Sequence, residues 1–291
     1  MATSDLLARC SFPAPGTPVV CALSGGPDSA ALVALAVHAE LDVTAVHVHH
    51  GLRPSADHDA QAANRIADHL GVAFHGVAVE LDDGPNLEAR ARNARRTVLG
   101  AAALTGHTAD DQAETMLLNL LRGAGATGLA AMRPGPTHPI LALRRSETHA
   151  LCDVLGLRPA HDPSNDDPRF RRNRVRHQLV PLAADIADRD LAPLLVRTAD
   201  LLRDDDDFLQ VLAAKIDPTD ARVVADAAAP VARRVVRAWL TIDGHPPDSA
   251  GVERVLAVAR GEALACDVAG VGKIRRSRQR LLLDRSGGIA G

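Results

Sequence analysis

Lysine is scarce in this sequence. Of the 33 lysine and arginine residues, only Lys215 and Lys273 are lysines, and neither lies in the first two thirds of the chain. For that part of the chain, this absence excludes a Walker-type phosphate contact and a Schiff base, because both need a lysine. Phosphate charge there must be neutralised by arginine, backbone N–H groups or a metal ion.

Cysteines and long apolar runs are also few. The four cysteines stand far apart without a C-x-x-C pair, which argues against a disulfide framework, a zinc ribbon or an iron–sulfur site. No apolar run approaches the ~20 residues that span a bilayer. Residues 1–12 lack the basic and apolar regions of a secretory signal. We therefore expect a cytoplasmic protein without a membrane partner.

The length and the distribution of charge point to two domains and an anionic partner. A chain of 291 residues exceeds the ~250 at which single cores stop growing. The net charge is −3, yet residues 169–177 and 273–280 form basic clusters that provide a local footprint for nucleic acid. The pattern changes near residue 180. We therefore predict one domain over 1–180 and a smaller, mainly helical domain over 181–291, ending in a strand hairpin.

Strands and helices alternate through the first domain. Short β-branched, apolar segments predict strands at residues 17–24, 42–50, 72–81 and 101–107. Helical patterns follow them at residues 27–40, 55–71, 86–100 and 108–123. This order predicts an α/β fold with a doubly wound, mostly parallel sheet. Such sheets bind ligands at the carboxyl ends of their strands, where several polar turns converge here.

The turn after the first strand has the composition of an anion-binding site. It consists of Ser24, Gly25, Gly26, Pro27, Asp28 and Ser29. The glycines let the backbone approach a ligand, and the following helix start supplies N–H groups. A plain strand-to-helix turn would use glycine and a capping Asp or Ser about as well. Local pattern therefore leaves both interpretations open.

A second polar group falls on one face of the fourth predicted helix. This group begins at His107 and continues with Asp110, Asp111 and Glu114, which follow His107 by three, four and seven residues. A capping box with Thr108 as N-cap would explain Asp111 but not the other members. Adjacent carboxylates suit a cationic ligand, and the pattern leaves open whether that ligand is an amine or Mg²⁺.

Two basic or histidine-rich segments complete the candidate site. Residues 169–177 carry five arginines, a density that favours contact with phosphate over an ordinary solvated face. His47, His49 and His50 suggest zinc at first sight. Their alternation on a strand splits them between two faces, and no cysteine is near, so we do not predict a metal site there.

These motifs resemble those of a known family. The turn SGGPDS resembles the S-G-G-x-D-S signature of the N-type ATP pyrophosphatases, which cleave ATP to AMP and pyrophosphate. Further segments resemble tRNA(Ile)-lysidine synthetases, in the order VHVHHGLR, NLEARARNAR, GHTADDQAETMLLNLLRGAGATGLAAM and DPSNDDPRFRRNRVRHQLVP. The resemblance is close over residues 18–182 and looser beyond. Arg96 stands where the family usually has tyrosine, and His138 where it has arginine.

The resemblance implies a carbon–nitrogen ligase with an adenine nucleotide alpha hydrolase-like fold. ATP and Mg²⁺ would adenylate the wobble cytidine in the CAU anticodon of tRNA(Ile), and free L-lysine would displace AMP. The second domain would bind tRNA. The resemblance implies catalytic roles for Asp28, Arg92, His107 and Asp111, and a possible Mg²⁺ contact at Asp28. It implies ATP contacts at residues 24–29 and His49. The implied substrate contacts are Arg92, Asp110, Asp111, Glu114, Arg172, Arg174 and Arg176.

Other functions remain open at this point. A tRNA thiolase would adenylate a base and deliver sulfur, usually with paired cysteines, which the cysteine spacing here disfavours. An amidating synthetase shares the S-G-G-x-D-S signature but acts on small molecules, without need of the arginine run. A non-catalytic RNA-binding protein would not require the turn and the acidic motif. The sequence leaves monomer and homodimer both open.

Overall fold

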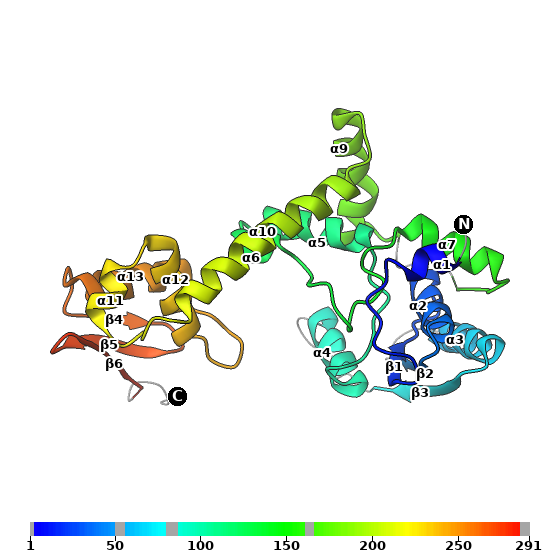
Figure 1. Cartoon of the computed structure of the whole chain (residues 1–291), viewed down its shortest axis with the longest axis horizontal. Helices are drawn as coiled ribbons and strands as arrows, with labels where there is room; N and C mark the ends of the chain where they lie inside the picture. Colours follow the sequence, from blue (N-terminus) through cyan, green and yellow to red (C-terminus); the bar gives the residue numbers. More distant parts are fainter. Residues whose placement is uncertain (1–2, 50–55, 80–86, 161–165, 286–291) are drawn as a thin grey trace. The chain divides into compact units, whose positions relative to one another are not determined.

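The computed structural model describes residues 3–49, 56–79, 87–160 and 166–285 (Figure 1). The chain divides into two compact units, residues 1–200 and 201–291. This division falls within helix α10, Ala192–Ala213. The boundary predicted near residue 180 stays a prediction. Helix α9, Val180–Ala187, lies between residue 180 and the division at residue 200.

The first unit alternates strands and helices along its first half. These elements are α1 Thr3–Leu7, β1 Pro18–Ala22, α2 Pro27–His38, β2 Asp42–His49, α3 Ala56–Leu70, β3 Ala73–Ala78 and α4 Leu87–Leu99. Helices follow, interrupted by a π-helix labelled η2: α5 Ala109–Leu121, α6 Ala126–Leu129, α7 Arg145–Val154, α8 Arg171–Arg174, η2 Val175–Leu179 and α9. The alternation matches the predicted order of elements.

The sheet of the first unit is parallel, with the order β1-β2-β3. The predicted fourth strand is reduced to one parallel bridge between Cys21 and Leu104, on the side of β1 away from β2. Two backbone hydrogen bonds flank this bridge, but the next N–H, of Thr105, donates to Thr137 instead. Pairing therefore stops after one residue. Since the chain crosses to the other side of β1 here, the strand ends form the crevice where ligands of such sheets bind.

Helix α2 lies at the centre of the core of the first unit. Its residues Ala30 to Ala36 are all fully buried. A helix that is apolar all round must be covered on every side, and α2 packs against the sheet, α3 and α7. Figure 1 shows these helices beside the strands. The packing fixes the start of α2, and with it the turn at residues 24–29.

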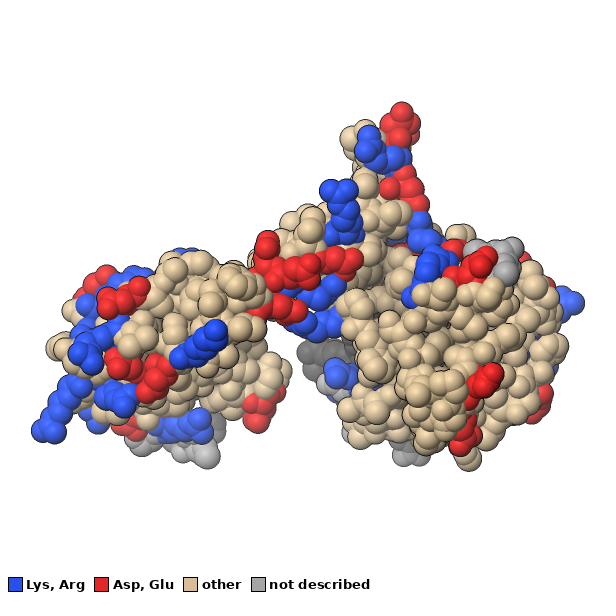
Figure 2. All heavy atoms as spheres, in the orientation of Figure 1, with Lys and Arg blue, Asp and Glu red and all other residues tan. Residues whose placement is uncertain are grey.

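The second unit has its own core and a small antiparallel sheet. It contains the end of α10, α11 Ala221–Asp226, α12 Ala229–Trp239, α13 Ser249–Arg260, β4 Ala265–Val268, β5 Gly272–Ser277 and β6 Arg280–Asp284. Val236, Val255 and Ile274 are fully buried between the helices and the sheet. The predicted hairpin is present as β5 and β6, and β4 extends it to three strands. Figure 2 shows basic and acidic side chains interspersed over this unit.

Helix α10 is 22 residues long but strongly charged. It carries four consecutive aspartates at residues 204–207. Such a helix would leave ionised groups in hydrocarbon, which is costly. Among the described residues, no helix combines the length and the apolar character that crossing a membrane requires.

Candidate active site

The turn between β1 and α2 is a compact hydrogen-bonded loop. The Ser29 hydroxyl donates to Gly26 O at 2.8 Å, and Ser24 N donates to Ser29 Oγ at 3.1 Å. The two serine hydroxyl oxygens lie 3.0 Å apart. Gly26 is the N-cap of α2 and has no side chain that could cap the helix, so no N-cap side chain occupies the first N–H groups of α2. This geometry fits an anion.

Glycine is required at two places in this crevice. Gly25 has φ +92°, and a Cβ there would lie 2.9 Å from the backbone oxygen of Asp59. A Cβ at Gly106, in the turn after the fourth segment, would lie 2.7 Å from Asp28 O. Backbone oxygens cannot yield as flexible side chains can. The turn at residues 24–29 is therefore held against both α3 and the loop that leads into α5.

We expect Gly25→Ala to destabilise the first unit and weaken nucleotide binding. The positive φ alone costs about 1–2 kcal/mol for a residue with a Cβ, and the overlap with Asp59 adds to it. Thermal unfolding and titration with an ATP analogue would measure both effects. The control is Gly71→Ala, which has φ +66° but open space around the new Cβ. It should lower the melting temperature without changing nucleotide affinity. Equal nucleotide affinity in both variants would contradict the expected role of Gly25.

Asp111 uses its two carboxylate oxygens for different purposes. Oδ2 accepts hydrogen bonds from the backbone N–H and the hydroxyl of Thr108, both at 2.9 Å, which completes the capping box at the start of α5. Oδ1 faces three guanidinium groups. Arg145 Nη2 lies 3.0 Å away, Arg172 Nη2 2.9 Å and Arg176 Nη2 3.5 Å. The capping-box interpretation and the binding-site interpretation are therefore compatible in this one residue.

Glu114 is the most buried carboxylate of the cluster, with 3% of its side chain exposed. It accepts from Arg145 Nη1 at 3.1 Å, Arg172 Nε at 2.9 Å and Arg176 Nε at 2.7 Å. Arg172 and Arg176 are four positions apart across α8 and η2, so both reach the same acids. A π-helical turn is a frequent feature of functional sites. We call Asp111, Glu114, Arg145, Arg172 and Arg176 the ion-pair cluster.

Asp110 belongs to a neighbouring pair. It accepts from Arg144 Nη2 at 3.0 Å and from the backbone N–H of Arg145 at 2.8 Å. Arg144 also contacts Asp190. Asp110 therefore helps to fix the start of α7 and points to a different arginine from its neighbour Asp111.

The carboxylates differ in the sign of their pKa shifts. Burial opposes ionisation of Asp111, but the charges of Arg145 and Arg172 outweigh it and lower its pKa. Burial is also the largest single influence on Asp110, but the hydrogen bonds from the Arg144 side chain and the Arg145 backbone, together with the charges of both arginines, outweigh it and lower the pKa of that group. Asp28 differs. Burial raises its pKa, and the charge of Asp111 adds to this effect against the hydrogen bond from Thr148 and the charge of Arg145. A raised carboxyl pKa in a cleft is typical of a functional group.

Histidines line the same sheet edge in two roles. His47 is buried, and its Nδ1 lies 2.8 Å from Leu23 O, so it ties β2 to the end of β1. Its ring stacks on His49 at 6.2 Å between centroids. His107 Nδ1 lies 2.9 Å from Thr105 Oγ1, and the ring is 5.2 Å from that of His138. His49 and His107 are thus at the strand ends, while His47 is structural.

The structure brings several of the predicted site residues together and separates others from them. Asp28, Asp111, Glu114, Arg172 and Arg176 lie together. Arg174 is exposed and contacts Gln178 instead. Arg92 lies in α4, but its side chain is outside the described residues. His50 and residues 51–53 and 162–165, which the sequence motifs include, are also outside them.

Arg145 is the central residue that sequence reasoning missed. It contacts Glu114 and Asp111, and its Nε lies 3.5 Å from Asp28 Oδ2, so it links the turn to the acids. Arg144 is the N-cap of α7 and Arg145 its first residue. Cations at a helix N-terminus oppose the helix dipole. Two adjacent arginines at a helix start were therefore the signal that could have identified this residue.

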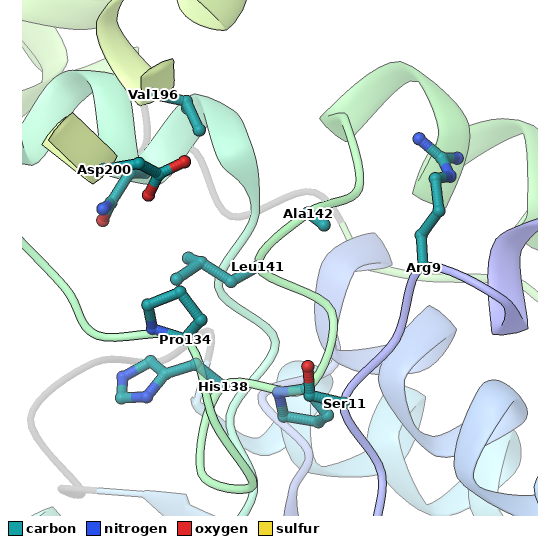
Figure 3. A pocket seen from close by; sticks show the side chains of 10 residues that line it. Arg9, Ser11, Pro134, His138, Leu141, Ala142, Val196 and Asp200 are labelled. Carbon is teal, nitrogen blue, oxygen red and sulfur yellow. The ribbon is translucent and has the colours of Figure 1, made fainter. Parts of the chain in front are cut away.

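A separate pocket is lined by other residues of the first unit. Figure 3 shows Pro134, His138 and Leu141 on one of its sides. Its complete lining is Arg9, Ser11, Gln112, Pro134, His138, Pro139, Leu141, Ala142, Val196 and Asp200. Gln112 donates to Met132 O at 2.9 Å and so holds the loop after α6. The pocket contains none of the clustered carboxylates, so we do not place the chemistry there.

Comparison with known proteins places both parts of the chain in one family. The family model of the PP-loop domain matches residues 5–183, and that of the TilS substrate binding domain matches residues 221–282. The U34-tRNA thiolase NcsA from Methanococcus maripaludis has a TM-score of 0.56 at 17% identity, covering 69% of this chain and 78% of that chain. This likeness concerns the fold alone, and it agrees with the predicted adenine nucleotide alpha hydrolase-like class.

Three relatives illustrate the similarity along the chain. The tRNA(Ile)-lysidine synthase of Mycolicibacterium paratuberculosis is 42% identical over 83% of this chain and 81% of that protein. The synthase of Nocardia farcinica is 43% identical over 80% and 78%. That of Mycobacterium bovis is 39% identical over 92% and 88%. With identity of this extent in both units, the chain belongs to the tRNA(Ile)-lysidine synthase family.

Proposed function

We propose that this protein is a tRNA(Ile)-lysidine synthase that uses ATP to join lysine to the wobble cytidine of a CAU anticodon. The observation that carries this proposal is the position of Arg145. One guanidinium contacts Asp28 of the nucleotide turn and the acids Asp111 and Glu114. Activation by the nucleotide and recognition of lysine would therefore take place in adjoining parts of one crevice.

The reaction has two balanced steps. The ring carbonyl oxygen of cytidine attacks the α-phosphorus, an O–P bond forms, and pyrophosphate leaves. The lysine amine then forms a C–N bond at the same ring carbon, AMP leaves with the oxygen, and the amine loses a proton. The first step concentrates negative charge, which positioned cations stabilise. Since residues 1–200 contain no lysine, that task falls to arginines and backbone N–H groups.

Asp28 is our candidate for contact with Mg²⁺. Among the described residues, no three His, Cys, Asp or Glu side chains are grouped as a metal site. Mg²⁺ in nucleotide sites usually takes one or two carboxylates together with phosphates and water. A bound cation would supply charge neutralisation at the phosphates. Asp28 suits this role because a bound cation would favour its ionised form, which burial disfavours, and because Arg145 is its only charged partner within salt-bridge distance among the described residues.

The acids proposed to receive lysine are already paired with arginine. Glu114 and Asp111 each contact Arg145, Arg172 and Arg176. An incoming ammonium group would therefore exchange with a guanidinium. A displaced guanidinium would retain its charge and its donors, which suit a phosphate of ATP or tRNA. Arg172 and Arg176 can serve both ligands in this way.

The second unit is proposed to contact tRNA through its antiparallel sheet. Lys273, Arg275 and Arg278 are exposed on β5 and at the turn that follows. Arg278 and Gln279 form that turn with φ of 47° and 65°, a conformation that favours glycine or asparagine. A strained turn that presents an arginine supports a binding role. This surface lies within the part that matches the substrate binding domain.

A thiolase function is not favoured. Burial raises the pKa of the Cys10 thiol to about 11 and those of Cys21 and Cys152 to about 12. A thiolate is the reactive form of cysteine, and groups with such pKa values are almost entirely protonated at neutral pH. All four cysteines are free, and the sequence contains no C-x-x-C pair. The cytoplasmic location remains a prediction, as do the alternatives of monomer and homodimer.

The direct test is transfer of labelled lysine to a tRNA(Ile) transcript with a CAU anticodon, in the presence of ATP and Mg²⁺. We expect label at the wobble nucleoside, together with release of AMP and pyrophosphate. A transcript with uridine at the wobble position is the matched control and should remain unlabelled. Pyrophosphate release without label would keep base adenylation but assign another nucleophile. No tRNA-dependent pyrophosphate release by folded protein would overturn the proposal.

A further inference from the structure

One face of helix α7 contacts the nucleotide turn at three points. Arg145, Thr148 and Cys152 are spaced by three and four residues, so they share a face. Thr148 Oγ1 donates to Asp28 Oδ1 at 2.5 Å, and Arg145 Nε lies 3.5 Å from Asp28 Oδ2. Cys152 Sγ lies 3.4 Å from Pro27 O. Both oxygens of the Asp28 carboxylate are therefore approached from α7.

The Thr148 hydroxyl makes the shortest of these contacts. Thr148 is fully buried, and its Oγ1 has two acceptors in reach, Asp28 Oδ1 at 2.5 Å and Arg145 O at 2.8 Å. One hydroxyl proton serves one acceptor at a time, and a carboxylate forms the stronger bond. A threonine within a helix can bond its own helix without any outside partner. The contact with Asp28 is therefore not needed to satisfy the Thr148 hydroxyl, which could bond to Arg145 O of its own helix.

Asp28 needs such a contact to keep its orientation. It lies in the first turn of α2, where Asp111 repels it and burial disfavours its charge. A carboxylate in this situation tends to turn away or to take up a proton. A donor held rigidly on a packed helix opposes both changes, and misplacement by about 1 Å is enough to impair positioned groups. Helix α7 packs directly on α2, which makes it a rigid support.

We propose that Thr148 is a positioning residue that fixes the Asp28 carboxylate toward the nucleotide. This inference rests on the proposed role of Asp28 in ATP binding. It assigns to α7 a function in nucleotide binding and activation, although α7 lies outside the nucleotide turn itself. The hydroxyl, rather than the size of the side chain, is the feature that this role requires.

The test compares Thr148→Val, which keeps the shape and removes the hydroxyl, with Thr148→Ser, which keeps the hydroxyl. Binding of a Mg²⁺-bound, non-hydrolysable ATP analogue is measured without tRNA or lysine, and kcat and KM for ATP are measured in pyrophosphate release. We expect Thr148→Val to lose about 10–100-fold in kcat/KM, as for a hydrogen bond to a charged group. Thr148→Ser should stay within about threefold of the unmodified protein, on the same scale.

The matched control is Thr198→Val on α10. The Thr198 hydroxyl donates to Leu194 O at 2.9 Å and meets no carboxylate, so its loss should leave ATP kinetics unchanged. Equal loss in Thr148→Ser and Thr148→Val, or near-normal activity in Thr148→Val, would overturn the proposal. If valine prevents folding, Thr148→Ala is compared with Thr148→Ser in the same assays. Lysine transfer by the unmodified protein decides the proposed function separately, since the analogue-binding comparison needs neither tRNA nor lysine.

Discussion

Asp28→Ala is expected to lower lysine transfer strongly while leaving the fold intact. The carboxylate belongs to the nucleotide turn and contacts Arg145. Burial raises its pKa, which means that keeping it ionised in the folded protein costs free energy. Its removal should therefore change the melting temperature little. Loss of a positioned charge that acts on the transition state typically lowers turnover by about 10²–10³-fold. Pyrophosphate release and thermal unfolding measure the two quantities.

The control for this variant is Asp153→Ala. Asp153 is an exposed aspartate of the supporting helix α7, and its substitution should leave turnover and melting temperature close to those of the unmodified protein. Near-normal turnover in Asp28→Ala would contradict the assigned geometry. A large fall in its melting temperature would instead assign Asp28 a structural role.

Arg145→Met is expected to impair both stability and catalysis. Its guanidinium contacts Asp28, Asp111 and Glu114, and removing it leaves buried carboxylates with less compensating charge. Arg172 and Arg176 still contact Asp111 and Glu114, so we expect a loss of about 1–3 kcal/mol in unfolding free energy rather than the larger cost of an unpaired charge. Turnover should fall by about 10²-fold or more, because Arg145 links the turn to the acids.

Arg145→Lys separates charge from geometry. An ammonium keeps the charge but cannot reproduce the planar fork that meets three carboxylates. We therefore expect this variant to recover most of the stability and little of the turnover. Arg158→Met, at an exposed position after α7, is the control for loss of an arginine in this region. Denaturant unfolding and steady-state kinetics distinguish these cases. Full turnover in Arg145→Met would contradict the assignment of Arg145 to the site.

Much of the fold follows from local pattern. The turn at residues 24–29, the helix that starts at Pro27, and the capping box of Thr108 and Asp111 depend on residues close in sequence. Their periodicity and turn chemistry are therefore readable. The predicted strand at residues 101–107 is reduced to a single bridge because Thr105 bonds to Thr137. That outcome depends on a loop some thirty residues away, which local pattern cannot include.

The arginine run shows the same division within one segment. Its density predicted contact with anions, and the spacing of Arg172 and Arg176 places them on one helical face. Arg174 has the same composition around it but points to solvent, because the helix turns it away from the acids. Composition thus identified the segment, while the phase of the helix against α5 selected which arginines enter the site.

The sequence by itself determined the alternation of strands and helices, the nucleotide turn, the acidic face of α5 and the family, since each is written in residues that are neighbours along the chain or in a helix. Only the tertiary structure decided that Arg145 and Thr148, which are 117 and 120 positions from Asp28, hold its two oxygens. The physical reason is the packing of α7 on α2. Burial of two apolar helix faces sets their registry, and that registry brings a hydroxyl and a guanidinium to one carboxylate.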